Sequence, residues 1–201
     1  MIFYVRGIYE LEDPLMVGFF ERASTELRAS AISFVGRGLY TIVGDDIVAP
    51  QDLISDEMLK RITDLWNVRI SLAVASDDST KFRSEIGEFG WWFVAPQFDE
   101  SWLLDQLESV LKTIGTIDYG HLVVRRMAKM ASSHPAEVLR CLRLMLQRDQ
   151  HGWLILNRDT AVREILATTL QSNETGIRDL AEEITHELGA RGYREFRSLL
   201  E

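Results

Sequence analysis

Apolar residues recur along most of this chain at the three-to-four-residue spacing of an α-helix, and this periodicity restricts its fold more than any other feature. The clearest stripe follows Asp99, a residue type favoured at a helix N-cap. Its members are Leu103, Leu104, Leu107, Val110, Leu111 and Ile114. Alternation at period two is nowhere sustained, and the best strand candidates are Met1–Val5 and Tyr40–Val43. We therefore predict an all-α chain of about nine helices joined by short turns.

Two helices and the turn between them recur at a separation of 39 residues near the C-terminal end, so that Val123 corresponds to Val162 and Cys141 to Leu180. Helix-pair repeats of about 40–47 residues are typical of HEAT and armadillo arrays, whereas the tetratricopeptide repeat has about 34. Over residues 118–190 the chain therefore resembles the HEAT-like class. That resemblance implies a right-handed superhelix of stacked antiparallel helix hairpins.

We predict a single helical-repeat domain over residues 1–201, with a less regular half at 1–98 and a more regular HEAT-like half at 99–201. Stacked arrays need polar caps or a neighbouring domain at their ends. The C-terminal segment is expected to form a short capping helix with Tyr193 and Phe196 facing inward. The apolar N-terminal run would be an exposed end, which favours a chain that is part of a larger protein or is covered by a partner or a second copy.

The order from the aromatic segment Phe89–Phe93 through Asp99–Trp102 to Gly192–Phe196 is similar to helical C-terminal regions of large bacterial ATPases and other defence-type proteins. This resemblance implies a bacterial protein and a place in a multidomain assembly. It carries no functional residue over to this chain.

Charge and cysteine content limit the environments in which the chain works. The formal net charge of −9 disfavours nonspecific attraction to nucleic acid or to an anionic membrane. A single cysteine excludes an internal disulfide, and no apolar run approaches the roughly 20 residues of a membrane helix. We expect a cytoplasmic protein that does not enter a membrane.

Sequence motifs for catalysis or cofactor binding are missing from the chain. It has no Walker-type phosphate loop and no Gly-x-Ser-x-Gly elbow. Glu183 and His186 have the spacing of a di-iron bundle ligand pair, but no second copy completes such a site. Cys141 occupies an apolar-stripe position, where a buried inert thiol is expected. We predict no catalytic residue, no metal and no cofactor, although a site assembled between helices stays open because such sites need not be sequence neighbours.

Positive charge is concentrated between Tyr119 and Arg148, a stretch with six basic residues and a single acidic residue, Glu137. They are Arg125, Arg126, Lys129, Arg140, Arg143 and Arg148. Because they fall on two consecutive helices of one proposed hairpin, they are candidates for one basic patch. Three interpretations stay open: salt bridges to neighbouring acidic helices, docking to an acidic protein surface, and contact with a nucleic-acid backbone.

Trp91 is the second candidate binding residue. If residues 82–93 form one helix, Phe82, Ile86, Phe89 and Phe93 share a face and Trp91 lies on the opposite side. The interpretations are packing between stacked repeats, an anchor for a partner protein, or a stacking platform for a small molecule.

The sequence therefore favours a non-enzymatic protein-interaction module or scaffold. Its expected contacts are the arginine face and Trp91, with a protein as partner and no small-molecule ligand. A nucleic-acid-binding helical repeat that uses the basic face over 119–148 is the alternative, followed by an enzyme whose site lies between helices. The sequence leaves a homo-oligomer open.

Overall fold

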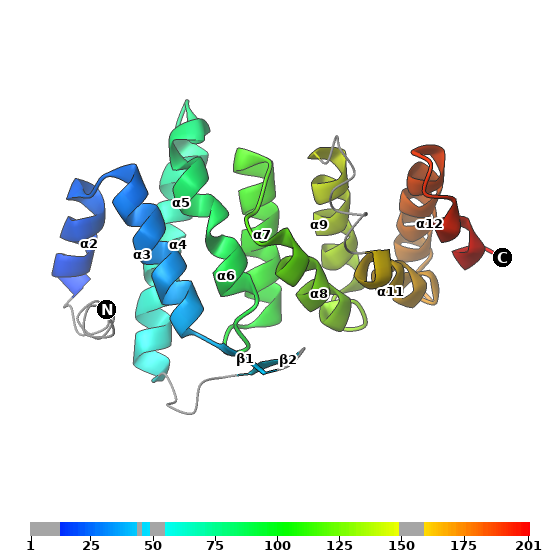
Figure 1. The fold of residues 1–201 in the computed structure, drawn as a ribbon, viewed down its shortest axis with the longest axis horizontal. Coiled ribbons are helices and arrows are strands. Elements are labelled where there is room, and N and C mark those ends of the chain that lie inside the picture. Colours follow the sequence, from blue (N-terminus) through cyan, green and yellow to red (C-terminus); the bar gives the residue numbers. More distant parts are fainter. Residues whose placement is uncertain (1–12, 44–45, 49–54, 149–158) are drawn as a thin grey trace.

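The structure, a computed structural model, describes residues 13–43, 46–48, 55–148 and 159–201, and helices dominate these residues, which confirms the all-α prediction (Figure 1). The helices are α2 (Asp13–Arg22), α3 (Thr25–Gly38), α4 (Asp56–Ala75), η1 (Ser79–Phe82), α5 (Arg83–Gly87), α6 (Phe89–Phe93), α7 (Glu100–Ile114), α8 (Gly120–Met130), α9 (Pro135–Arg148), α11 (Asp159–Leu170), α12 (Thr175–Ala190) and η2 (Arg194–Leu199).

One of the two strand candidates forms a small hairpin. Strand β1 (Thr41–Val43) pairs antiparallel with β2 (Asp46–Val48), with Ile42 opposite Ile47. The other candidate, Met1–Val5, lies outside the described residues. A two-stranded ribbon of three residues a side leaves the all-α class unchanged.

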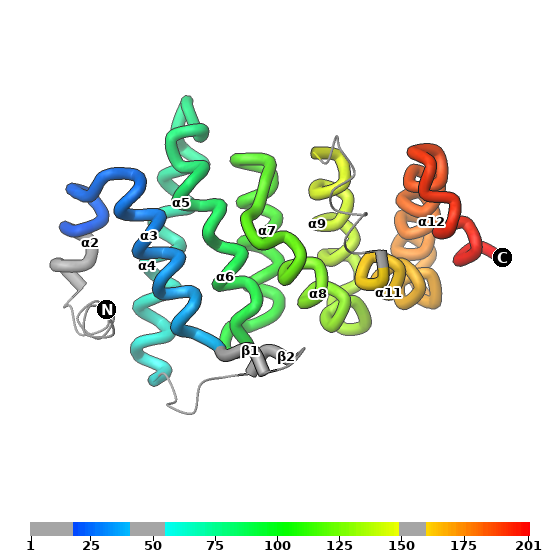
Figure 2. The backbone as a smooth tube through the Cα atoms, in the orientation of Figure 1, coloured from blue at the N-terminus to red at the C-terminus, as the bar shows by residue number. Residues whose placement is uncertain are grey.

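The helices form two layers that follow the chain along the long axis of the molecule (Figure 2). In one layer α4 contacts α7, α7 contacts α9, and α9 contacts α12. In the other, α3 contacts α5 and α6, α6 contacts α8, and α8 contacts α11. The helices that the 39-residue spacing relates therefore lie beside one another, α8 with α11 and α9 with α12. The assignment of these pairs to the HEAT class stays a prediction.

Local sequence signals fix the ends of α7. Asp99 is its N-cap, and the Asp99 carboxylate accepts a hydrogen bond from Trp102 N at 2.9 Å. At the other end Gly115 adopts φ 73°, a left-handed conformation that glycine reaches without steric cost. The apolar stripe between them is buried, including Leu103 and Leu107 with no exposed surface. Both the cap and the stripe follow the sequence prediction.

The single helix expected over residues 82–93 is instead three short pieces, η1, α5 and α6. The Gly87 carbonyl accepts a hydrogen bond from Asp118 N at 3.0 Å, where an unbroken helix would use Trp91 N. Trp91 N donates instead to Glu88 O at 3.1 Å, a tighter three-residue turn. The interruption rotates the residues after Glu88, so a helical projection of the whole segment misplaces them.

Aromatic side chains of this interrupted segment fill the core. Phe89 stacks on Trp66 of α4 with ring centroids 4.3 Å apart, and both side chains are fully buried. Trp92 is also fully buried, and its Nε1 donates to Ile32 O at 2.8 Å. This bond ties α6 to α3 and leaves the indole polar atom satisfied.

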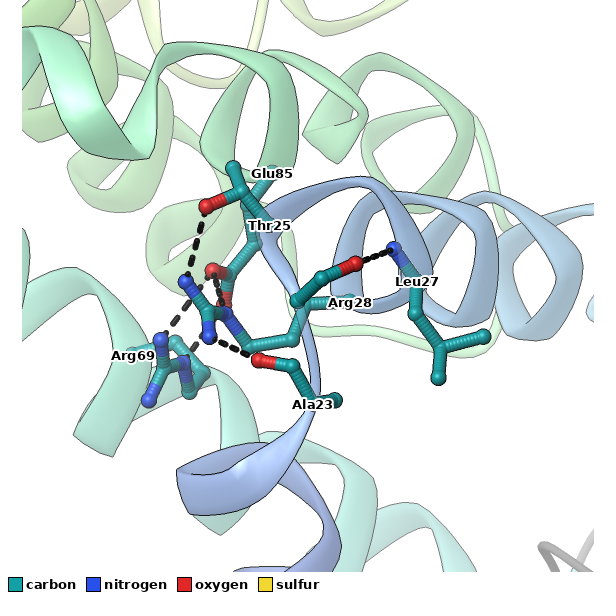
Figure 3. A network of polar contacts seen from close by, with 7 residues as sticks. Ala23, Thr25, Leu27, Arg28, Arg69 and Glu85 are labelled. Atoms are coloured by element: carbon teal, nitrogen blue, oxygen red, sulfur yellow. Dashed lines mark hydrogen bonds and ion pairs between the residues drawn. The ribbon is translucent and has the colours of Figure 1, made fainter.

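A buried ionic network joins α3, α4 and α5 (Figure 3). The Glu85 carboxylate has no exposed surface, and Arg69 Nη2 donates to its Oε2 at 3.0 Å. Arg28 Nε donates to the same oxygen at 2.7 Å, while Arg28 Nη2 also donates to Thr25 Oγ1. Arg69 is itself buried, although it carries a charge. Its charge is compensated by a partner sixteen residues away.

The C-terminal end of the array is closed by η2, as the sequence predicts. Phe196 is fully buried and Tyr193 packs against the core from the edge. Arg163 of α11 holds the segment by donating to Glu195 O at 2.9 Å and to Ser198 Oγ at 2.7 Å. The outer side chains of η2 are polar.

Candidate functional site

The basic residues of the predicted patch are divided between the two layers. Arg125, Arg126 and Lys129 belong to α8, which packs with α6 and α11. Arg140 and Arg143 belong to α9, which packs with α7 and α12. The two helices are consecutive and in contact.

Acidic residues of neighbouring helices pair with three of these arginines. Arg126 Nη2 donates to Glu100 Oε1 at 3.1 Å. Arg143 Nη2 donates to Glu183 Oε1 at 2.6 Å, which links α9 to α12. Arg140 lies 3.4 Å from both Glu108 on α7 and Glu137 on its own helix. Exposed positions on α8 are occupied by Arg125 and Lys129, four residues apart on one helical stripe.

Glu108 shows how strongly these pairs are coupled. Burial acts to raise the pKa of its carboxyl, but Lys112 and Arg140 outweigh burial and the pKa is lowered. The pKa of Arg140 is raised in turn, because Glu108 outweighs the effect of burial on the guanidinium. The surface over α7 and α9 therefore carries interleaved charges of both signs, in which Lys112 and Arg140 favour the charged form of Glu108 and Glu108 favours the charged form of Arg140.

Trp91 lies in an aromatic cluster between α3 and the start of α8 and is partly buried. Its ring centroid is 3.9 Å from that of Tyr119 and 6.1 Å from that of Tyr40. The Arg37 guanidinium stands 4.6 Å from the Trp91 ring centroid, within cation–π range. The structure thus places Trp91 at a packing position between helices of one layer.

Several polar groups of the Trp91 cluster are in unusual environments. Trp91 Nε1, Tyr40 Oη and Glu88 Oε2 are buried and have no hydrogen-bond partner. Burial raises the pKa of Glu88 above 4.5 and raises that of Tyr40 to about 12. Tyr119 has φ 55°, a left-handed conformation that is uncommon for a bulky side chain. No residue of this cluster apart from Trp91 was singled out from the sequence.

Chemistry-bearing groups are otherwise dispersed over the described part of the chain. Within the described residues no group of three or more His, Cys, Asp and Glu side chains is placed to hold a metal ion. Glu183 is engaged by Arg143. Burial raises the pKa of the Cys141 thiol to about 12, and Cys141 Sγ lies 3.6 Å from Leu104 O. A thiol held protonated in this way is a poor nucleophile at neutral pH.

The outer face of α4 was missed by the sequence reasoning. Val68, Leu72 and Val74 are 51%, 48% and 60% exposed. Together with Leu27 they are the exposed large apolar side chains of the residues that the structure describes. From residue 65 to residue 75 the only charged residue is Arg69, which is buried, so the outer face of the last three turns carries no charge. Apolar periodicity identifies the helix face that is expected to be buried. It does not reveal apolar residues that lie on the opposite, exposed face.

The first half of the same α4 face is strongly charged. Arg61 Nη2 donates to Glu57 Oε1 at 2.8 Å, and Lys60 pairs with Asp64. The change from charged to apolar falls within one helix, which contacts α7, α5 and η1. This makes the second half of the α4 outer face, over residues 68–75, the apolar candidate surface.

Comparison with protein-family models, with curated proteins and with solved structures finds no match to this chain. None of the helices that the structure describes is both long enough and apolar enough to cross a membrane.

Proposed function

We propose that the chain is a non-enzymatic protein-interaction module or scaffold that works as part of a larger assembly. The observation that carries the proposal is the contrast between the polar outer side of η2 and the apolar outer face of α4. At η2 the outer side chains are polar and Arg163 holds the segment, whereas the second half of the α4 outer face exposes Val68, Leu72 and Val74 without charge. Exposed apolar surface of this kind marks protein contacts in soluble proteins.

The residues of the basic face supply a second surface for the same function. Arg140 and Arg143 are already paired with carboxylates of α7 and α12, so an acidic partner would exchange one set of ion pairs for another. Exchange of this kind tunes association rate and specificity more than affinity. The apolar face of α4 is therefore the primary surface of the proposal, and the basic face is secondary.

A capture experiment tests the proposal. The wild type is compared with Leu72→Glu on α4, with Arg125→Glu/Arg126→Glu/Arg143→Glu on the basic face, and with Leu27→Glu as a matched control. Leu27 is 50% exposed on α3, so this control changes an equally exposed leucine elsewhere. Bound proteins are identified by mass spectrometry from a nuclease-treated lysate of the source organism, after circular dichroism has established that each variant is folded.

We expect Leu72→Glu to lose a protein that the wild type and Leu27→Glu both retain. If only the arginine variant loses it, the function stands and the surface moves to α8 and α9. If nuclease removes all material bound by the wild type, the nucleic-acid alternative replaces the proposal. A wild type that captures nothing specific overturns the proposed function.

A further inference from the structure

The turn before α8 packs into the break between α5 and α6. Asp118 N donates to Gly87 O at 3.0 Å, and Asp118 Oδ2 lies 2.8 Å from the position that a Cβ atom on Gly87 would take. The Asp118 carbonyl oxygen fills the space that a Cβ atom on Gly90 would need. The two glycines therefore allow a contact in which both the backbone and the carboxylate of Asp118 lie against the interrupted helix.

The same turn holds one residue in an unfavourable conformation. Tyr119 has φ 55°, and a bulky side chain keeps such a left-handed backbone only where its surroundings hold it. The ring centroids of Trp91 and Tyr119 are 3.9 Å apart, and Arg37 Nη2 donates to Tyr119 Oη at 3.4 Å. The closed contact is therefore maintained against a backbone preference, and Tyr119 can leave this conformation when the contact opens.

Two carboxyl groups lie at this contact. Glu88 joins α5 to α6, and its Oε2 is buried without a hydrogen-bond partner. Burial raises the pKa of Glu88, and the negative charge of Asp118 acts in the same direction. Burial also raises the pKa of Asp118. Both carboxyl groups therefore hold their protons more tightly in the closed contact than they do in water.

Side chains of the neighbouring helices oppose this effect only in part. The groups that act to lower the pKa of Glu88 are Ser33 and Arg37 on α3 and Trp91 on α6. Arg83, at the start of α5, acts to lower the pKa of Asp118. Because both pKa values are raised in spite of these groups, the charged forms of the two carboxyl groups are not fully compensated in the closed contact.

Other titratable side chains stand near the two carboxyl groups. Tyr40 and Tyr119 pack around Trp91, and burial raises the pKa of Tyr40 to about 12, far above the range in which carboxyl groups titrate. His121 is exposed on the first turn of α8, three residues after Asp118. Histidine is the side-chain type that titrates closest to neutral pH, so the effect of His121 has to be separated by substitution.

We propose that this contact is a pH-sensitive latch: protonation of Glu88 and Asp118 holds the turn before α8 on the α5–α6 break, and ionisation of both carboxyl groups favours local opening. The two ionised groups repel each other and lose part of their contact with water when the latch is closed, and opening returns both to water. The stabilisation of the closed form is present below the ordinary pKa values of 3.8 and 4.5 and is lost as pH rises through the raised values. The latch is independent of the proposed function, because it lies at the junction of α6 with α8 and not on the α4 face.

Hydrogen exchange at the Asp118 amide, measured by NMR on the full chain, reports the latch directly, because this amide donates across the contact. Its protection factor compares the observed exchange rate with the intrinsic rate at each pH. We expect this factor to fall on the order of tenfold from acidic to neutral pH, as the two carboxyl groups ionise. The Tyr193 amide, which donates to Leu188 O at 3.1 Å in the turn after α12, is the internal control and should keep its protection.

Two results of this measurement overturn the latch. A parallel fall at Tyr193 would show that the whole fold loosens with pH, so that opening is not local to the α5–α6 break. A protection factor at Asp118 that does not change with pH would show that neither carboxyl group controls the contact.

Substitutions assign the pH dependence to the two carboxyl groups. Glu88→Gln and Asp118→Asn each remove one ionisation, so each should reduce the fall at residue 118, and the double variant should abolish it. His121→Gln and Glu182→Gln are the controls and should keep the wild-type fall, because both positions are exposed and neither supplies a carboxyl group to the contact. If His121→Gln removes the fall, or if both single carboxyl variants keep it, another group controls opening and the proposal is wrong. The single variants decide the outcome even where the double variant does not fold.

Discussion

Arg69 and Glu85 form a buried ion pair in which Arg69 Nη2 donates to Glu85 Oε2 at 3.0 Å. The carboxylate has no exposed surface and also accepts from Arg28. Two arginines therefore depend on one acid, and that acid joins α5 to both α3 and α4. The arrangement makes the N-terminal half of the array sensitive to the loss of a single charge.

We expect Glu85→Gln to lower the free energy of unfolding by about 3–5 kcal/mol, because it leaves buried arginine charge uncompensated. Urea denaturation followed by circular dichroism measures the change. Glu57→Gln is the matched control, since Glu57 is paired with Arg61 on the exposed face of α4 and surface pairs contribute about 0–1 kcal/mol. If the two substitutions lower the free energy of unfolding equally, the buried network contributes no more to stability than a surface ion pair does.

The Tyr40 hydroxyl is buried without a hydrogen-bond partner, so its removal should not destabilise the fold. Tyr40→Phe is expected to raise the free energy of unfolding at neutral pH by about 1 kcal/mol, since an unsatisfied buried polar group is lost. Thermal unfolding measures the difference. A loss of more than about 1 kcal/mol would mean that the hydroxyl has a partner in solution.

The pH dependence of the wild type and Tyr40→Phe should also differ at alkaline pH. Burial raises the Tyr40 pKa from 10.0 to about 12, so the folded state holds the phenolic proton more tightly than the unfolded state. The corresponding stability is present below pH 10.0 and is lost as pH rises toward about 12. Tyr40→Phe should lack this part of the decline, which parallel unfolding curves between those pH values would reveal.

Glu88 provides a second pH-dependent test, in the acidic range. Burial raises its pKa above 4.5, and the nearby Asp118 carboxylate acts in the same direction, while Ser33 and Arg37 act against it. The folded state therefore favours protonated Glu88, and the stability that this contributes is present below pH 4.5 and is lost as pH rises through the raised pKa.

We therefore expect Glu88→Gln to gain stability relative to the wild type as pH is raised from acidic to neutral. Urea unfolding at several pH values gives the difference directly. Glu182→Gln, on an exposed position of α12, serves as the control and should show no such trend. A Glu88→Gln curve that runs parallel to the wild-type curve would contradict the assigned burial effect.

Gly90 marks a position where no side chain fits. A Cβ atom at Gly90 would lie 1.9 Å from Asp118 O, so Gly90→Ala must push α6 away from the turn before α8. We expect Gly90→Ala to lower the free energy of unfolding by about 1–3 kcal/mol or more, because the core around it becomes overpacked. Gly176→Ala on α12 is the matched control, because nothing lies within 4 Å of its Cβ position and alanine favours a helix by about 0.5–1 kcal/mol. Urea unfolding should therefore show a decrease in the free energy of unfolding for Gly90→Ala and an increase for Gly176→Ala.

The features that the sequence predicted correctly are those encoded over a few residues. Asp99 as an N-cap, Cys141 as a buried thiol and Phe196 as an inward-facing cap residue all follow from spacing within one or two turns. Apolar periodicity and helix capping depend on residues within one or two helical turns, so both can be predicted from a single sequence.

The features that it missed depend on residues far apart in the chain. The helix breaks after Gly87 because the Asp118 amide donates a hydrogen bond to the Gly87 carbonyl, which would otherwise accept one within the helix. The pairing of Arg28 with Glu85 spans 57 residues. For the basic face, the sequence located the charges but not the layer to which each belongs, because only tertiary contacts assign α8 and α9 to different layers. The α4 surface left a readable trace, the absence of exposed charge between residues 65 and 75.

The order of contacts within the two layers has a consequence for how the chain folds. Helices that are neighbours within a layer are close along the chain, as α7 and α9 are with α8 between them, and the farthest side-chain hydrogen bond described spans 82 residues, from Arg37 to Tyr119. Loop-closure entropy is modest for contacts of this range, and chains dominated by local contacts fold quickly. The array can therefore grow outward from any adjacent set of helices, without waiting for its two ends to meet.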